Sequence, residues 1–208
     1  LKYIDMIFDV LVIGGGAAGM SCALVLGSAK KSSFASEKNI GIVLHQRSSA
    51  LENAKFYNVL GLKPGTTGKE ILESGMAQLT DTYPHIIQIK HEKVLLVNGE
   101  KNNFTVGTNK NTYKAKTVVV AVDASNLFQI EGLMEWVIPH ENIPAIKEKI
   151  QLKNVKHLIK EGLYVAGVLS GHRSQFAIAC GSGAQVATDI LTEWNNGIST
   201  VVHDSIEK

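Results

Sequence analysis

A glycine-rich turn near the start of the chain has the residue spacing most indicative of chemistry. Gly14, Gly16 and Gly19 form a G-x-G-x-x-G pattern between an apolar run at 8–13 and a small-residue run at 20–26. Gly14 permits a sharp turn, Gly16 lets a phosphate approach the backbone because it has no Cβ, and Gly19 lets a helix pack closely on a strand. The spacing therefore predicts a strand, a turn and a helix that bind a dinucleotide pyrophosphate.

The residues after Gly16 begin the predicted helix and would provide the anion contacts. Backbone amides at the start of a helix have no partner within the helix, and they lie at the positive end of its dipole. We therefore expect Gly14, Gly16, Ala17, Ala18 and Gly19 to line the pyrophosphate site. The residues alone leave one alternative open, which is a tight strand-to-helix turn that binds no ligand.

The composition is that of an ordinary globular protein. The 208 residues, 45% of them hydrophobic, suit one large domain or two small ones. A net charge of +2 gives no argument for nucleic acid or an anionic membrane. Glycines interrupt the apolar segment 6–26, so it does not resemble a membrane-spanning segment. The acidic residues Asp5 and Asp9 also make this segment unlike a signal peptide. We therefore expect a cytoplasmic protein without a membrane or nucleic-acid partner.

The cysteines and histidines predict neither a redox disulfide nor a metal site. Cys22 and Cys180 are the only cysteines, and no C-x-x-C motif is present. Each lies among small apolar residues on a predicted helix, so buried packing is the favoured interpretation. The histidines show no metal-ligand spacing with one another or with carboxylates; they include His85, His91, His140, His157 and His203.

Hydrophobic periodicity predicts an α/β fold with a meander of short strands. Parallel strands are expected at 8–13 and 41–44, and a helix capped by Thr67 or Thr66 at 69–80. Half-polar strands at 86–89, 93–97, 104–106 and 112–115 predict an antiparallel meander, followed by a separate buried strand at 117–122. A last strand is expected at 163–166 and a long helix at 175–194.

A lysine-rich segment at 146–159 has an irregular apolar pattern. The favoured interpretation is a solvated helix face, and a docking surface for an acidic redox partner is the alternative. The lysines of this segment and its border are Lys147, Lys149, Lys153, Lys156 and Lys160.

Four stretches, in order along the chain, carry the motifs of one family. They are the glycine-rich segment 10–26; N-V-L-G at 58–61 with G-K-E-I-L at 68–72; V-V-V-A-V-D at 118–123; and G-L-Y-V-A-G at 162–167 with the helix segment 175–184. Together they resemble the FAD domain of thioredoxin reductase-like flavoproteins, in the pyridine nucleotide-disulfide oxidoreductase superfamily. The resemblance implies an FAD-binding Rossmann-like domain with a central parallel sheet and an antiparallel β-meander.

The resemblance also shows where this chain departs from the family's cofactor site. An acid usually binds the adenosine ribose at the end of the second strand, where this chain has His45 or Gln46. The family's A-G-D motif corresponds to Ala166, Gly167 and Val168, so its acid is also missing. Losing one charge-assisted hydrogen bond weakens binding by roughly 1.5–3 kcal/mol.

The start of the last helix is the segment that the resemblance places against the flavin. The backbone amides of Gln175, Phe176 and Ala177 would face the flavin ring and favour its anionic reduced form. Arg173 could pair with a phosphate or the flavin, and His172 could relay a proton, although solvated loop residues are the favoured interpretation of both. No catalytic residue can be assigned from the sequence.

Relatives insert an NADPH-binding domain where this chain has a short connection. About 40 residues separate Val122 from Leu163, a βαβ unit alone needs roughly 30, and no second glycine fingerprint occurs there. We therefore expect a single FAD-binding domain over 1–208. Its two segments, about 1–125 and 160–200, would be joined by a linker.

These features favour an FAD oxidoreductase that exchanges electrons with an external partner. The partner would be a redox protein or diffusing NAD(P)H, and a homodimer is compatible with the resemblance. The alternative is a degenerate, non-enzymatic protein that binds a dinucleotide or acts through contacts with a partner. An NAD-type Rossmann protein is a weaker third interpretation, because simple NAD domains have no such meander.

Overall fold

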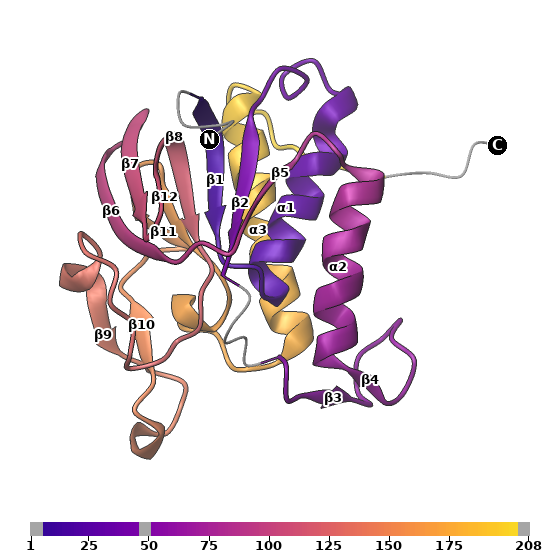
Figure 1. Ribbon diagram of the computed structural model, residues 1–208, viewed down its shortest axis with the longest axis vertical. Helices are drawn as coiled ribbons and strands as arrows, with labels where there is room; N and C mark the ends of the chain where they lie inside the picture. The colour runs from indigo at the N-terminus through magenta and orange to yellow at the C-terminus, as the bar shows by residue number, and fades with distance from the viewer. Residues whose placement is uncertain (1–5, 46–50, 204–208) are drawn as a thin grey trace.

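A mostly parallel sheet runs through the centre of this computed structural model, which describes residues 6–45 and 51–203 (Figure 1). Its eight strands are β1 (Ile7–Ile13), β2 (Ile40–Leu44), β5 (Ile87–Lys90), β6 (Val94–Glu100), β7 (Asn103–Thr108), β8 (Thr112–Val120), β11 (Leu158–Lys160) and β12 (Leu163–Val165). The order across the sheet is β11-β12-β8-β1-β2-β5, and the five strands from β12 to β5 are parallel. The predicted α/β class with a central parallel sheet is confirmed.

Strand β8 joins the parallel sheet to the antiparallel meander. One edge of β8 pairs with β1 along most of its length. The other edge pairs with β7 through residues 112–115 and with β12 through residues 118–120. The predicted division into strands 112–115 and 117–122 is therefore wrong, because β8 is one continuous strand that pairs with both the parallel strands and the meander. The strand expected at 86–89 is β5, which pairs with β2 in parallel and does not belong to the meander.

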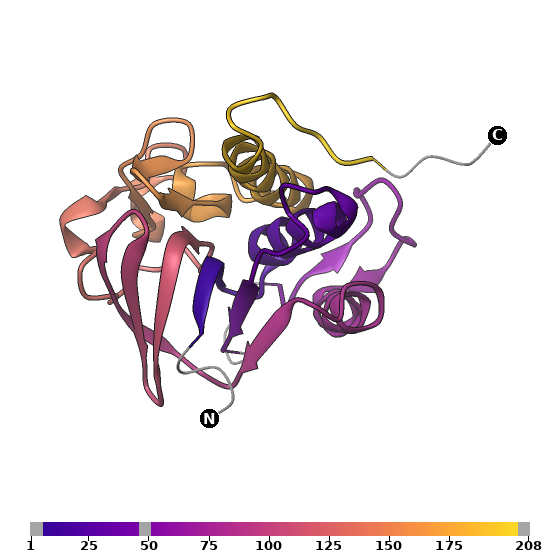
Figure 2. The same cartoon turned by 90° about the horizontal axis from the view of Figure 1, so that it is seen from above.

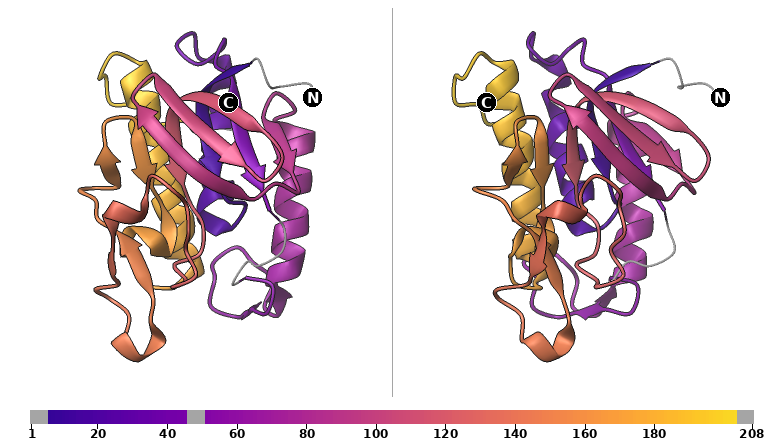
Figure 3. Two further views of the ribbon diagram at one scale, coloured as in Figure 1. Left: turned by 60° about the vertical axis from the view of Figure 1, so that its left-hand side comes forward. Right: turned by 90° about the vertical axis from the view of Figure 1, so that its left-hand side faces the viewer.

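Helices cover one face of the sheet, and the meander crosses the other. The helices are α1 (Ala17–Ser28), α2 (Gly68–Thr82) and α3 (Phe176–Trp194), with short 3-10 turns η1 (Ala29–Lys31), η2 (Met134–Trp136), η3 (Ala145–Lys147) and η4 (Gly167–Ser170). Figure 2 shows α1 and α3 side by side, with α2 beyond α1, and Figure 3 shows β6 and β7 over the opposite face. No helix in the described ranges is both long and apolar enough to cross a membrane.

Buried side chains of β1 alternate between two cores. Val10 and Val12 pack with α1 and α3, whereas Leu11 and Ile13 pack with the meander side. A parallel strand buried on both faces has a nearly continuous apolar sequence, which explains the run at 8–13.

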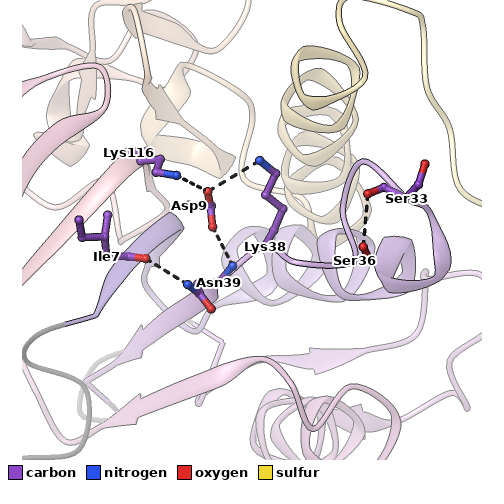
Figure 4. Close-up of polar contacts among 7 residues, drawn as sticks. All are labelled: Ile7, Asp9, Ser33, Ser36, Lys38, Asn39 and Lys116. Carbon is purple, nitrogen blue, oxygen red and sulfur yellow. Dashed lines mark hydrogen bonds and ion pairs between the residues drawn. The ribbon is translucent and has the colours of Figure 1, made fainter.

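A buried carboxylate fastens β1 to its neighbours (Figure 4). Asp9, only 6% exposed, accepts hydrogen bonds from Lys116 Nζ and from the Asn39 backbone amide, both at 2.9 Å. Lys38 Nζ lies 3.8 Å from the same carboxylate. A buried charge is costly without such partners, so Asp9 helps to align β1 with β8 and the start of β2. Nearby, Ser36 Oγ donates to the Ser33 carbonyl at 3.3 Å and closes the loop before β2.

Helix α2 begins with a capping box. Thr67 Oγ1 accepts from the Glu70 amide, and the Glu70 carboxylate accepts from the Thr67 amide at 2.7 Å. Thr66 donates instead to the Lys63 carbonyl, so the structure selects Thr67 of the two predicted caps. Before the helix, the short strands β3 (Lys55–Phe56) and β4 (Thr66–Thr67) pair with each other.

The lysine-rich segment does not form the predicted helix. Strands β9 (Val137–Pro139) and β10 (Ile150–Leu152) pair as an antiparallel hairpin, joined by residues 140–149. Ile150 and Leu152 alternate with a period of two and belong to or pack against the meander-side core, which favours a strand over a helix. The hairpin extends from the lower left of the molecule in Figure 1.

Candidate functional site

The start of α1 presents unpartnered backbone donors. The first helical hydrogen bond runs from the Met20 amide to the Gly16 carbonyl at 2.9 Å, and Gly16 provides no side-chain cap. The amides of Ala17, Ala18 and Gly19 therefore have no acceptor within the described chain. Three donors at the positive end of a helix form a site suited to a phosphate.

Two glycines of the motif bring this helix close to the sheet. Gly14 has φ +112°, and a Cβ there would lie 2.4 Å from the Ala121 carbonyl oxygen. A Cβ on Gly19 would lie 1.9 Å from the Gly14 carbonyl oxygen. Only glycine is compatible with both the left-handed turn and these contacts, which gives the sharp turn and close packing that the motif predicts.

A second glycine turn lies beside the first. Gly167, at φ +78°, follows β12, and a Cβ there would lie 3.0 Å from the Ala18 Cβ. Its amide donates to Ser182 Oγ at 2.8 Å, so Gly167 offers close approach but no free donor. Val168 is partly buried, and its side chain packs against the meander-side core. The position of the family's acid therefore carries no charge.

Side chains from the β9–β10 region hold this second turn. His140, 6% exposed, has its Nε2 3.0 Å from the Val168 carbonyl oxygen and donates to it. Asn142 Nδ2 donates to the Gly171 carbonyl at 2.9 Å, and Asn154 Nδ2 donates to the Ser170 carbonyl at 3.1 Å. These residues give no local sequence signal, because each acts on backbone that is distant along the chain.

The start of α3 is also rich in donors. The Gln175 amide donates to the Arg173 carbonyl at 2.9 Å, and Gln175 provides no side-chain cap. The first helical bond runs from Ala179 to Gln175, so in the described part of the chain the amides of Phe176 and Ala177 have no acceptor. The Phe176 ring lies 5.1 Å from the ring of Phe56, which holds β3 against this helix start.

Of the two residues expected to contact the ribose, only His45 lies within the described ranges. His45 directly follows β2 and is exposed, at the carboxyl edge of the sheet. Gln46 lies outside the described residues. A neutral imidazole can hydrogen-bond a hydroxyl, but it does not replace a carboxylate.

The remaining reactive side chains are not activated. Burial raises the pKa of the Cys22 thiol to about 12, and it also raises the pKa of Cys180. Neither thiol therefore resembles an acidified redox cysteine. Arg173 is exposed, whereas His172 is partly buried and contacts His157. Within the described ranges no group of three or more His, Cys, Asp or Glu side chains could hold a metal ion.

Taken together, the parallel sheet, the two glycine turns and the two amide-lined helix starts define a dinucleotide-binding α/β protein. The sequence pattern of the pyridine nucleotide-disulphide oxidoreductase family matches residues 8–184. The chain therefore belongs to that family, whose members bind FAD.

Individual relatives are distant. The chain is 26% identical over 196 residues to an uncharacterized oxidoreductase, CzcO, of Bacillus velezensis, covering 89% of this chain and 52% of that protein. It is 24% identical over 155 residues to a ferredoxin–NADP reductase of Streptococcus pneumoniae, covering 69% of this chain and 45% of that protein. The chain thus spans about half the length of these curated relatives. A solved thioredoxin reductase from Gloeobacter violaceus has the same fold, with a TM-score of 0.72 at 14% identity over 98% of this chain and 100% of that one.

Proposed function

We propose that the chain holds FAD across the two helix starts and acts as an oxidoreductase that exchanges electrons with an external partner. The amides of Ala17, Ala18 and Gly19 would bind the pyrophosphate, and those of Phe176 and Ala177 would face the flavin ring. When bound, FAD would supply the electron-transfer chemistry. The chain's own contribution is to orient the cofactor and to stabilise negative charge at both helix starts.

The spacing of the helix starts is the observation that carries this proposal. Ala18, at the start of α1, packs against Gly183, which lies seven positions beyond Phe176 in α3. At 1.5 Å per residue, α3 begins about 10 Å further out than this contact. Such an offset suits an extended cofactor, with phosphates at one helix start and an aromatic ring at the other. Figure 1 shows α1 and α3 beginning at the same lower end of the molecule.

Val168 favours a second candidate function. The second glycine turn lacks the acid of the family's motif, which lowers the expected FAD affinity by one to two powers of ten. A protein that binds a dinucleotide without catalysing electron transfer would be compatible with this loss. The lack of an acid at the ribose position, which is His45 or Gln46, supports the same alternative.

The electron partner would come from outside the chain. Only residues 140–149 connect β9 to β10, which leaves no room for an NADPH domain at this point. We therefore propose one FAD-binding domain over 1–208, with segments of about 1–125 and 160–200. A redox protein or diffusing NAD(P)H would be the donor or acceptor, and a ferredoxin is a reasonable first choice because one relative is a ferredoxin–NADP reductase.

Titration of the cofactor-free protein with FAD, followed by flavin fluorescence, tests the binding site. Gly16 has an extended φ of −78°, so Gly16→Asp introduces no backbone strain and places a carboxylate at the free amides of α1. This variant should keep or gain thermal stability and bind FAD at least tenfold more weakly. Gly181→Ala is the matched control, since a Cβ there meets no neighbouring atom, and it should bind like the wild type. Absence of FAD binding, or equal binding by Gly16→Asp, would contradict the site.

Redox assays separate the two candidate functions. The FAD-loaded protein would be mixed with NADH or NADPH as donor, and with ferricyanide or oxidised ferredoxin as acceptor. Turnover by the wild-type protein that is lost in the Gly16→Asp variant supports the oxidoreductase function. FAD binding without turnover for every donor supports the non-enzymatic alternative.

A further inference from the structure

Two histidines that are 15 residues apart in the sequence meet next to the second glycine turn. His157 precedes β11, and His172 lies between η4 and α3. Their Nε2 atoms are 3.4 Å apart, and their rings are tilted by 44° with centroids 5.1 Å apart. Both side chains are partly exposed, so solvent reaches the pair.

The backbone fixes the tautomer of one imidazole. His157 Nδ1 lies 3.0 Å from the Val165 carbonyl oxygen, which can only accept, so Nδ1 carries the proton. The lone pair of His157 is then on Nε2, on the side of His172. Metal-binding histidines are typically held in this way, with one nitrogen donating to a carbonyl and the other free to coordinate.

The separation of the two nitrogens matches the edge of a coordination tetrahedron. Imidazole nitrogens bind zinc at about 2.0–2.1 Å, and two such ligands in tetrahedral geometry lie about 3.4 Å apart. A metal ion could therefore replace the proton that the two Nε2 atoms now share, after a modest rotation of the His172 ring.

Coordination requires both imidazoles in their neutral form. The cationic sequence neighbours of the pair, Lys156 and Arg173, are both exposed, so their charged groups can remain in solvent.

We propose that His157 and His172 form a two-histidine site for a divalent transition-metal ion, with water molecules as the remaining ligands. Imidazole ligands bind Cu²⁺ more tightly than Ni²⁺ or Zn²⁺. A bound ion would cross-link the turn before β11 to the loop that leads into α3.

Isothermal titration of tag-free, EDTA-treated protein with Cu²⁺ and Zn²⁺ tests this site. One ion per chain is expected, with Cu²⁺ tighter, nitrogen hyperfine coupling in the Cu²⁺ EPR spectrum, and affinity that falls as the pH is lowered because protons compete. His157→Gln and His172→Gln should each weaken binding at least tenfold. His203→Gln, which alters an exposed histidine outside the pair, should not.

Thermal unfolding provides a second measurement. Added Zn²⁺ should raise the melting temperature of the wild type and of His203→Gln, but not of the two pair variants, because an ion that binds only the folded state stabilises it. Wild-type protein that binds neither ion at 1 mM, or pair variants that bind like the wild type, would overturn the proposal.

Discussion

Gly183 of α3 faces Ala18 of α1 so closely that a Cβ on Gly183 would lie 1.9 Å from the Ala18 carbonyl oxygen. Ala18 is also one of the residues with an unpartnered amide at the start of α1. The contact therefore sets how far the start of α3 extends beyond the start of α1. This packing determines the distance between the two donor-rich helix ends.

Substitution of Gly183 by alanine should destabilise the protein. The added methyl group meets backbone atoms, which cannot move aside like the end of a side chain, so we expect a loss of about 1–3 kcal/mol in the free energy of unfolding. Urea denaturation measures this change. Gly181→Ala, in the same helix with open space around it, should be neutral or stabilise by up to about 1 kcal/mol. Similar losses in both variants would show that α1 and α3 do not pack as described.

Restoring the family's acid at Val168 should tighten FAD binding. We expect Val168→Asp to lower the dissociation constant by about one to two powers of ten, the effect of one charge-assisted hydrogen bond. The substitution removes a partly buried apolar side chain, so some stability should be lost. Flavin fluorescence titration measures the affinity. Val168→Asn, which has no charge, should give a smaller gain, and an equal gain would argue against a role for the carboxylate.

Stability should fall in mildly acidic solution because of His172. Burial lowers its folded-state pKa below the ordinary value of 6.5, so the unfolded chain binds more protons as the pH falls through 6.5. The free energy of unfolding should therefore decrease with falling pH until the folded-state pKa is passed. Urea denaturation between pH 7.5 and 5 measures this slope, which should be smaller in His172→Gln. Parallel pH profiles for the two proteins would contradict the assignment.

Thr67 rather than Thr66 should matter for the start of α2. Thr67→Ala removes the capping box with Glu70 and should cost about 0.5–2 kcal/mol of stability. Thr66→Ala loses only its bond to the Lys63 carbonyl and should cost less. Chemical denaturation of both variants compares them, and the reverse order would mean that the helix begins elsewhere.

Local sequence patterns predicted most of the elements. The glycine motif, the continuous apolar runs and the threonines before α2 each act on backbone within a few residues, so their spacing is sufficient. The helix expected at 146–159 was wrong. Part of this segment is strand β10, which is stabilised by pairing with β9, and that pairing is a contact with residues outside the segment.

The sequence by itself determined the first glycine turn, the helices α1, α2 and α3, and the lack of an acid at Val168. These features depend on residue type and on neighbours along the chain. Only the tertiary structure decided that β8 pairs with both the parallel strands and the meander. It also decided that His140 and Ser182 hydrogen-bond the second glycine turn and that His157 contacts His172. Those contacts join residues that are far apart in sequence, and they form only when the sheet brings the carboxyl ends of its strands together.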